Sequence, residues 1–377
     1  MKLQTVGALF GAAALAVSMS ACSTTNDTQT KDTAGDAAAK PTVYASTDVW
    51  ASVAKAVVGD KADVITSIDQ PNLDPHSYEA SVKDKKLVNQ ASVVIVNGGG
   101  YDDWALQLAK SAGKKPTVLN AVELAGIDCG DAEGHDHEAG HEHEDAHEHE
   151  EGHEHEEAHE HEEAHEHEEA HEHEEAHEHE EAHEHEEGHE EGHEHEGHHH
   201  HHHHCAVNEH VFYDLHAVSE VAKAVASTMS KADSDNAAAY QDAAKAFQGK
   251  LDELESQAEQ IKARGEKHSL ATEPLANYLL EDAGIHDLTP EEYVEQSETE
   301  SGPSVKTQAD TKALITDGKV DMLLLNSQTE DPVSQDLQDA AKAKGIPVVT
   351  LTETLAGASD YVSWIGAALD QIDNALK

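Results

Sequence analysis

Basic and aromatic residues are scarce in this chain of 377 residues. Lysine and arginine number 24 against 77 aspartates and glutamates, so the formal net charge is −53 at pH 7. Phenylalanine, tryptophan and tyrosine together make up only 4% of the chain. A charge this negative argues against nucleic acid and anionic membrane surfaces as partners, and it favours cations.

Two common enzyme signatures are also missing. The sequence contains no G-x-S-x-G nucleophile elbow and no phosphate-binding loop. We therefore expect a binding protein and no enzymatic activity.

The apolar run near the N-terminus, residues 6–17, is too short to cross a bilayer core of about 30 Å. It follows a single basic residue, Lys2, and leads through small residues to Cys22, a pattern typical of a secretory signal. A cysteine directly after Ser-Ala is where lipoprotein processing attaches diacylglycerol. We expect residues 1–22 to be a signal peptide, a lipidated Cys22 to anchor the protein to the outer face of the cytoplasmic membrane, and residues 23–40 to be a flexible tether. A plain signal peptide with an incidental cysteine is the alternative.

An acidic, histidine-rich tract occupies residues 134–204 and contains 28 of the 33 histidines. It repeats the hexad AHEHEE and ends in seven consecutive histidines. Because it has no large apolar residue it cannot build a core, so we expect a disordered insertion at 131–204. Neutral imidazole suits zinc, copper and nickel, and the carboxylates add attraction, which predicts a low-affinity zinc antenna. Representative ligands are His147, His149, His153, His155, His198, His199 and His200. A solvated spacer without a metal role is the alternative.

Only three cysteines are present, and two of them, Cys129 and Cys205, bracket this tract. In an oxidising exterior such a pair most simply forms a disulfide that closes the base of the loop. The competing interpretation is that both thiolates bind metal alongside the histidines.

Outside the tract, strand-like runs alternate with helical ones, which predicts an α/β fold of parallel sheets with ligands beyond the carboxyl ends of the strands. The expected strands are residues 42–45, 63–67, 93–97, 117–120, 270–272, 322–326 and 347–351. Residues 234–264, rich in Ala, Leu, Glu, Lys and Gln, predict one long helix that links an N-terminal lobe, 41–230, to a C-terminal lobe, 265–377.

Several segments occur in the order typical of one family. DPHSYEAS at 74–81, ASVVIVNGGGYDDW at 91–104, the His/acid-rich insertion, and NEHVFYDLHAV at 208–218 resemble the zinc- and manganese-binding solute-binding lipoproteins of bacterial ABC transporters. The resemblance extends from residue 41 to the C-terminus. It implies two lobes joined by a rigid helix, a metal site in the cleft between them, a monomeric receptor, and an ABC permease as partner.

The resemblance also implies a set of metal ligands. His76 and His210 match the first two ligands of the family. Glu273 stands where zinc-type members have a third histidine, as glutamate does in manganese-type members. A late aspartate aligns with residues 326–332, where Asp331, or alternatively Glu330, is expected.

The identity of the metal follows from two opposing features. Two imidazoles with carboxylates form a harder ligand set than three histidines, which favours manganese. The histidine tract has no evident use for manganese, and a nitrogen/oxygen set still binds zinc more tightly. We therefore expect a high-affinity Zn²⁺ receptor, with a Mn²⁺ receptor, a surface zinc store or buffer, and an adhesin-like surface protein as alternatives.

Overall fold

A computed structural model describes residues 40–71, 73–127, 208–297 and 302–377. The expected signal peptide with Cys22, the tether, the histidine-rich tract, and both Cys129 and Cys205 lie outside the described residues. Residues Pro41–Lys377 form one compact unit. Among the described residues, no helix combines the length and the apolar character that a bilayer span requires.

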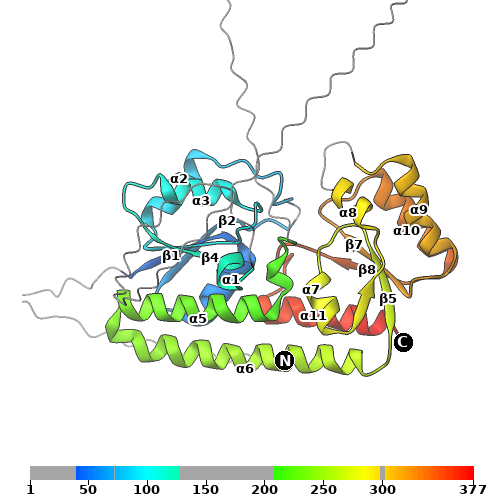
Figure 1. Cartoon of the computed structure of the whole chain (residues 1–377). Coiled ribbons are helices and arrows are strands. Elements are labelled where there is room, and N and C mark those ends of the chain that lie inside the picture. Colours follow the sequence, from blue (N-terminus) through cyan, green and yellow to red (C-terminus); the bar gives the residue numbers. More distant parts are fainter. Residues whose placement is uncertain (1–39, 72, 128–207, 298–301) are drawn as a thin grey trace, which may run out of the picture. The chain divides into compact units, whose positions relative to one another are not determined.

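The first half of this unit, here called the N-terminal lobe, is built on a four-stranded parallel sheet in the order β2-β1-β3-β4 (Figure 1). Its strands are β1 (Thr42–Thr47), β2 (Asp63–Ile68), β3 (Val93–Val96) and β4 (Thr117–Asn120). The inner strands are apolar and buried, as expected of parallel strands covered on both faces. Its helices are α1 (Asp48–Val58), α2 (Val82–Gln90), α3 (Asp103–Lys110), α4 (Ala121–Leu124), the short η1 (Val211–Tyr213) and α5 (Leu215–Ala232).

The second half, the C-terminal lobe, repeats this arrangement in the order β6-β5-β7-β8, again with parallel pairing throughout. Its strands are β5 (Lys267–Ala271), β6 (Ile285–Asp287), β7 (Met322–Asn326) and β8 (Val348–Leu351). The short edge strand β6 was not expected from the sequence. The helices are α7 (Asn277–Asp282), α8 (Glu291–Ser297), α9 (Val305–Thr316), α10 (Pro332–Lys344) and α11 (Tyr361–Ala375).

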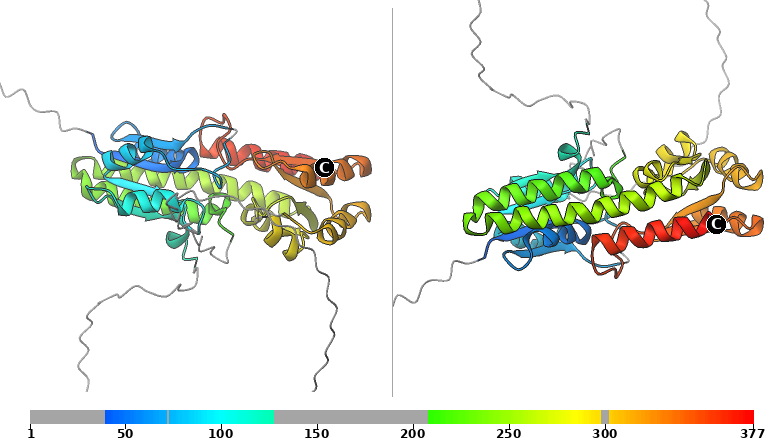
Figure 2. Two further views of the ribbon diagram at one scale, coloured as in Figure 1. Left: turned by 90° about the horizontal axis from the view of Figure 1, so that it is seen from above. Right: turned by 90° about the horizontal axis from the view of Figure 1, so that it is seen from below.

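One long helix, α6 (Ala237–Lys262), follows the short η2 (Ser234–Asn236) and contacts both lobes. It packs against α1 and α5 of the N-terminal lobe and against α7 and α11 of the C-terminal lobe (Figure 2). A single apolar core runs through these helices and one face of each sheet, and two smaller cores fill the opposite faces. The expected α/β architecture of two parallel-sheet lobes is therefore confirmed, and the shared core opposes independent movement of the lobes.

Candidate metal site

The loop after β2 presents His76 at the carboxyl edge of the N-terminal sheet. The Asp74 carboxylate accepts a hydrogen bond from the His76 backbone N–H at 2.9 Å, which fixes a tight turn around the buried Pro75. From the C-terminal lobe, the Gln328 amide donates to the Leu73 carbonyl at 2.7 Å. The loop is thus held from both lobes, while the His76 side chain stays 32% exposed.

His210 lies just before η1 and is only 2% exposed. The amide oxygen of Asn208 lies 2.7 Å from its Nδ1 and also accepts from its backbone N–H at 3.0 Å. The Asn208 amide nitrogen donates to the Pro274 carbonyl at 2.6 Å, so the oxygen is the atom that faces the ring. His210 Nδ1 must therefore carry the proton, which leaves the lone pair on Nε2.

Glu353 follows β8 in the C-terminal lobe and is fully buried. Its Oε2 accepts from the Tyr101 hydroxyl at 2.8 Å, and its Oε1 accepts from the Asn326 amide at 2.7 Å. These bonds satisfy the carboxylate from both lobes and aim Oε2 at the histidines.

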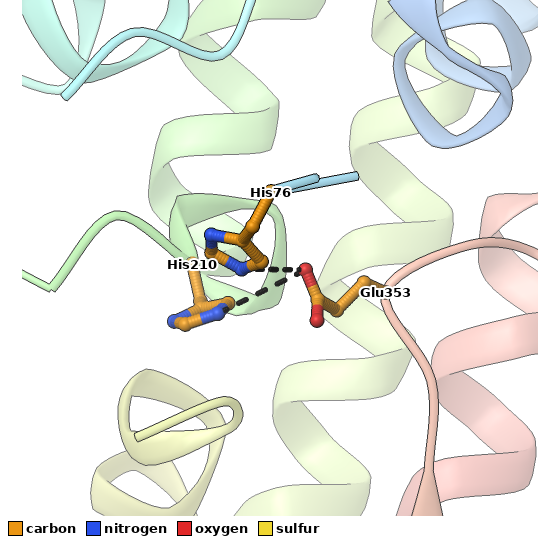
Figure 3. A group of neighbouring side chains, drawn as sticks. All are labelled: His76, His210 and Glu353. Atoms are coloured by element: carbon orange, nitrogen blue, oxygen red, sulfur yellow. Dashed lines mark ion pairs between the residues drawn. The ribbon is translucent and has the colours of Figure 1, made fainter. Parts of the chain in front are cut away.

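The three side chains converge from three separate segments (Figure 3). His76 Nε2 lies 3.0 Å from Glu353 Oε2, and His210 Nε2 lies 4.0 Å from the same oxygen. Within the described parts of the chain, one group of histidine, cysteine and acidic residues offers three ligand atoms, all within 4.8 Å of one another, and it is this one. Two imidazole nitrogens and a carboxylate oxygen so placed are a donor set suited to a divalent transition metal.

Opposite charges around His76 control its protonation. Burial would lower the pKa of this imidazole, but Glu353 and Glu209 raise it well above the ordinary value. Glu209 Oε1 lies 3.1 Å from His76 Nδ1, so both ring nitrogens face a carboxylate. Burial would likewise raise the pKa of Glu353, yet His76 and the bond from Tyr101 bring it to about 2. In the metal-free protein an imidazolium therefore bridges two carboxylates at neutral pH.

The pKa of His210 is shifted in the opposite direction. Burial lowers its pKa to about 4, because the favourable charge of Glu353 does not compensate for desolvation and for the nearby His76. Its Nε2 is buried and has no hydrogen-bond partner among the described residues. A neutral imidazole with an unused, buried lone pair is prepared for a metal ion, because such an atom is otherwise costly to bury.

Glu273 stands beside this group without joining it. Its Oε2 accepts at 2.6 Å from the same Asn326 amide nitrogen that bonds Glu353. Burial raises its pKa to about 7, the hydrogen bonds from Thr329 and Asn326 oppose that shift, and the charge of Glu353 adds to it. With this pKa the carboxyl is about half protonated at neutral pH, so a cation that binds it displaces a proton from part of the population.

Asp331 and Glu330 lie elsewhere. Asp331 is the N-cap of α10, and its carboxylate accepts from the Ser334 backbone N–H at 2.7 Å in a capping box. Both residues are exposed, and neither belongs to the converging group. The structure therefore does not bring the expected late aspartate to His76 and His210, and it places Glu353 there instead.

Sequence reasoning missed Glu353 and Glu209. A signal for Glu353 was present, because it comes two residues after the end of β8, at the edge where parallel sheets bind ligands. Glu209 adjoins His210 in the NEHVFYD segment, but no pattern showed that it faces His76.

Comparison with known proteins gives a consistent family. Residues 43–375 match the family model described as ZnuA, zinc-uptake complex component A, periplasmic. The iron ABC transporter substrate-binding lipoprotein MtsA of Streptococcus pyogenes serotype M1 is 34% identical over 118 residues, which cover 30% of this chain and 36% of that protein. The manganese ABC transporter substrate-binding lipoprotein scaA of Streptococcus gordonii is 28% identical over 126 residues, which cover 32% of this chain and 39% of that protein. The chain thus aligns with well under half the length of these relatives.

The fold has solved counterparts. The periplasmic zinc-binding protein TroA from Treponema pallidum superposes with a TM-score of 0.61 at 15% identity, covering 89% of this chain and 99% of that one. Together with the family match, this likeness confirms the resemblance noted in the sequence, and the family is one of transport components and not of enzymes.

Proposed function

Because the chain belongs to the family of periplasmic zinc-uptake complex component A proteins, we propose that it is an extracytoplasmic zinc receptor of an ABC importer. It binds one ion between its lobes and delivers it to the importer's permease. The relatives named for ABC transport of iron and manganese support the class of receptor while differing in metal.

The proposed ligands are His76, His210 and Glu353, with Glu273 as the fourth. The observation that carries this assignment is the buried Nε2 of His210, which has no hydrogen-bond partner in the described part of the chain and points at Glu353 across the boundary between the lobes. Two imidazoles and two carboxylates would complete a four-coordinate set with no position left for a reactive water, as suits a carrier and not a hydrolase. Asp331 serves as the N-cap of α10. We therefore assign the carboxylate ligand near the C-terminus to Glu353.

Capture begins by displacing a proton. The proton on His76 Nε2 occupies the place of the ion in the metal-free site, and it must leave before that nitrogen coordinates. Glu209 then retains Nδ1–H and orients the ring, as outer-shell carboxylates do for metal-bound histidines. No large closure is needed, because Tyr101 and Gln328 already join the lobes by hydrogen bonds.

Zinc is the proposed cargo, with manganese as the second candidate. The carboxylates favour a hard ion, but the same nitrogen and oxygen set follows the ordinary divalent order, in which zinc binds more tightly than manganese. The 28 histidines of the 134–204 tract favour the same metal, and we propose that the tract gathers zinc at low affinity for the cleft. An anchor at Cys22 and a disulfide between Cys129 and Cys205 complete the proposal.

Metal content and calorimetry of two variants test this function. Deleting 131–204 should leave one tight zinc equivalent per chain and remove several weaker ones. His210→Ala in the full chain should remove the tight equivalent and keep the weak ones. A surface zinc store predicts the reverse, with the tight equivalent lost in the deletion. Manganese bound in preference to zinc by the deletion variant would assign the receptor to manganese.

A further inference from the structure

Two histidines outside the cleft, His268 on β5 and His286 on β6, are brought together by the strand register. They are direct partners in the parallel pairing of β5 with β6. Partners in a parallel ladder project to the same face of the sheet. Their ring centroids are 6.0 Å apart, with 34° between the ring planes. Nothing in the sequence joined these residues, which lie 18 positions apart in segments without a metal motif.

A carboxylate completes the cluster. Glu266 precedes His268 by two residues, which in an extended chain places both side chains on one face. Its Oε1 lies 3.5 Å from His268 Nε2. The side chains of His268 and Glu266 are 33% and 71% exposed, and His286 is exposed as well, so an ion from solvent reaches all three.

The neighbouring charges leave this trio free for an ion. The carboxylate of Asp321 is occupied, because it accepts from the His268 backbone N–H at 2.8 Å and pairs with the Lys267 ammonium at 3.5 Å. Lys267 alternates with His268 along β5, so its side chain leaves from the opposite face of the sheet. Within the described residues, the ion-pair contact to these imidazoles comes from Glu266.

The cluster is separate from the cleft. His268 stands at the beginning of β5, whereas Glu273 follows the end of the same strand, so the two groups lie at opposite edges of the C-terminal sheet. The cluster also lies along the lateral edge of the sheet, because β6 is the outermost strand. This strand has only three residues.

From this arrangement we propose that His268, His286 and Glu266 form a second divalent-metal site, which takes zinc, copper or nickel on the outer surface of the C-terminal lobe. Two imidazoles and a carboxylate are a borderline ligand set, which these ions prefer to manganese or magnesium. The ligand atoms are spread more widely than in the cleft, so the exposed side chains rotate inward on binding. The resulting site is weaker than the cleft and keeps water on the ion. An ion held there cross-links β6 to β5 and fastens the short edge strand.

Histidine footprinting of the full chain tests the proposal. Diethyl pyrocarbonate modification is mapped by peptide mass spectrometry at increasing free zinc, which a metal buffer sets independently of the ions taken up by the 134–204 tract. His216 is the internal control, because it is exposed on the first turn of α5. Zinc should protect His268 and His286 with a common midpoint, at concentrations that leave His216 reactive. Manganese at the same concentrations should protect neither.

Matched variants decide whether the two rings act together. His286→Gln should raise the zinc midpoint for protection of His268 by about tenfold or more, whereas His216→Gln should leave it unchanged. His286 is exposed, so its replacement does not disturb a core, and an unchanged thermal melt of the metal-free variant checks this. The proposal is overturned if His268 is protected no better than His216, or equally well in the His286→Gln variant. His76→Ala should not alter the His268 midpoint, so the outcome is independent of the cleft.

Discussion

The N-terminal lobe presents imidazoles at the carboxyl edge of its sheet, whereas the C-terminal lobe, with the same strand order, presents carboxylates there. His76 and His210 come from the first lobe, and Glu353 and Glu273 come from the second. Each lobe alone offers a poor site. The carboxylate that the first lobe brings, Glu209, contacts His76 Nδ1 and not the nitrogen that faces Glu353, and the buried carboxylates of the second lobe lack a positive partner. The difference teaches that coordination depends on the boundary between the lobes, so an ion held there bonds to both of them.

The two histidines differ in the direction in which their surroundings shift the pKa. The pKa of His76 is raised because it lies between two carboxylates, while burial lowers the pKa of His210 to about 4. One ring therefore holds a proton in the absence of metal, and the other stays neutral with its lone pair free. Metal binding exchanges a proton for an ion at His76 and simply fills the vacant lone pair of His210.

The largest expected effect on zinc affinity comes from removing an imidazole ligand of the N-terminal lobe. His210→Ala should weaken zinc binding at the cleft by more than about 100-fold, beyond the loss caused by outer-shell changes, because a ligand is removed and a buried gap is left. Calorimetry on the 131–204 deletion variant measures this without interference from the tract. Tight binding that survived in His210→Ala would reject His210 as a ligand.

The next largest effect on zinc affinity should come from neutralising a carboxylate ligand of the C-terminal lobe. Glu353→Gln should weaken zinc binding by more than about tenfold, because the neutral amide still accepts from Tyr101 but carries no charge for the ion. The matched control is Asp331→Asn, which removes the alternative carboxylate and retains a good N-cap for α10. Its affinity should stay unchanged. The opposite result, with Asp331→Asn weakening binding and Glu353→Gln tolerated, would restore the aspartate expected from the sequence.

Glu353 and Asp331 also show which parts of the site could be predicted from the sequence. The alternation of apolar runs and helices predicted two parallel-sheet lobes, because burial of such strands on both faces leaves a clear pattern. The same reasoning placed ligands at the carboxyl edges, and His76 and His210 meet there. The late ligand was expected in the loop after β7, and the loop after β8 was not considered. Both loops contact the N-terminal lobe, Gln328 through Leu73 and Glu353 through Tyr101, and which of them turns a carboxylate toward the histidines depends on tertiary packing. The three-residue β6 was missed for a related reason, since its pairing with β5 and not its composition makes it a strand.

Outer-shell partners should have a smaller effect that sharpens the contrast between the two histidines. Glu209→Gln removes the charge that orients His76, and zinc affinity should fall by about 10-fold at neutral pH. The same change lowers the pKa of His76, so a smaller fraction of the rings must lose a proton, and the loss of affinity should shrink as the pH falls. A pH series of calorimetric titrations measures both effects. An affinity loss that is independent of pH would show that Glu209 does not act through His76.

Proton release counts the exchange at His76 and Glu273 together. Zinc binding to the deletion variant near pH 7 should release more than one proton. One comes from His76, and part of another comes from Glu273, whose pKa is about 7, while His210 is neutral beforehand. Titrations in buffers of different ionisation enthalpy yield this number. Release near zero would contradict the protonated His76, and His76→Gln should abolish the His76 contribution in any residual binding.

The smallest effect concerns the stability of the metal-free protein. The folded-state pKa of His76 is raised above its unfolded value of about 6.5, so its bridge between Glu209 and Glu353 stabilises the fold fully below that pH. This contribution is lost as the pH rises through the folded-state value. The side chain is 32% exposed, so solvent screening limits the effect to about 1 kcal/mol.

In the presence of chelator, the difference in unfolding free energy between the unaltered chain and His76→Gln should be larger at pH 6 than at pH 9.5. Comparing the two chains at each pH cancels the titration of every group the substitution does not perturb, and packing lost with the ring adds a constant offset. A gap that stayed constant or widened toward alkaline pH would exclude the imidazolium bridge, and with it the picture of a proton holding the place of the ion.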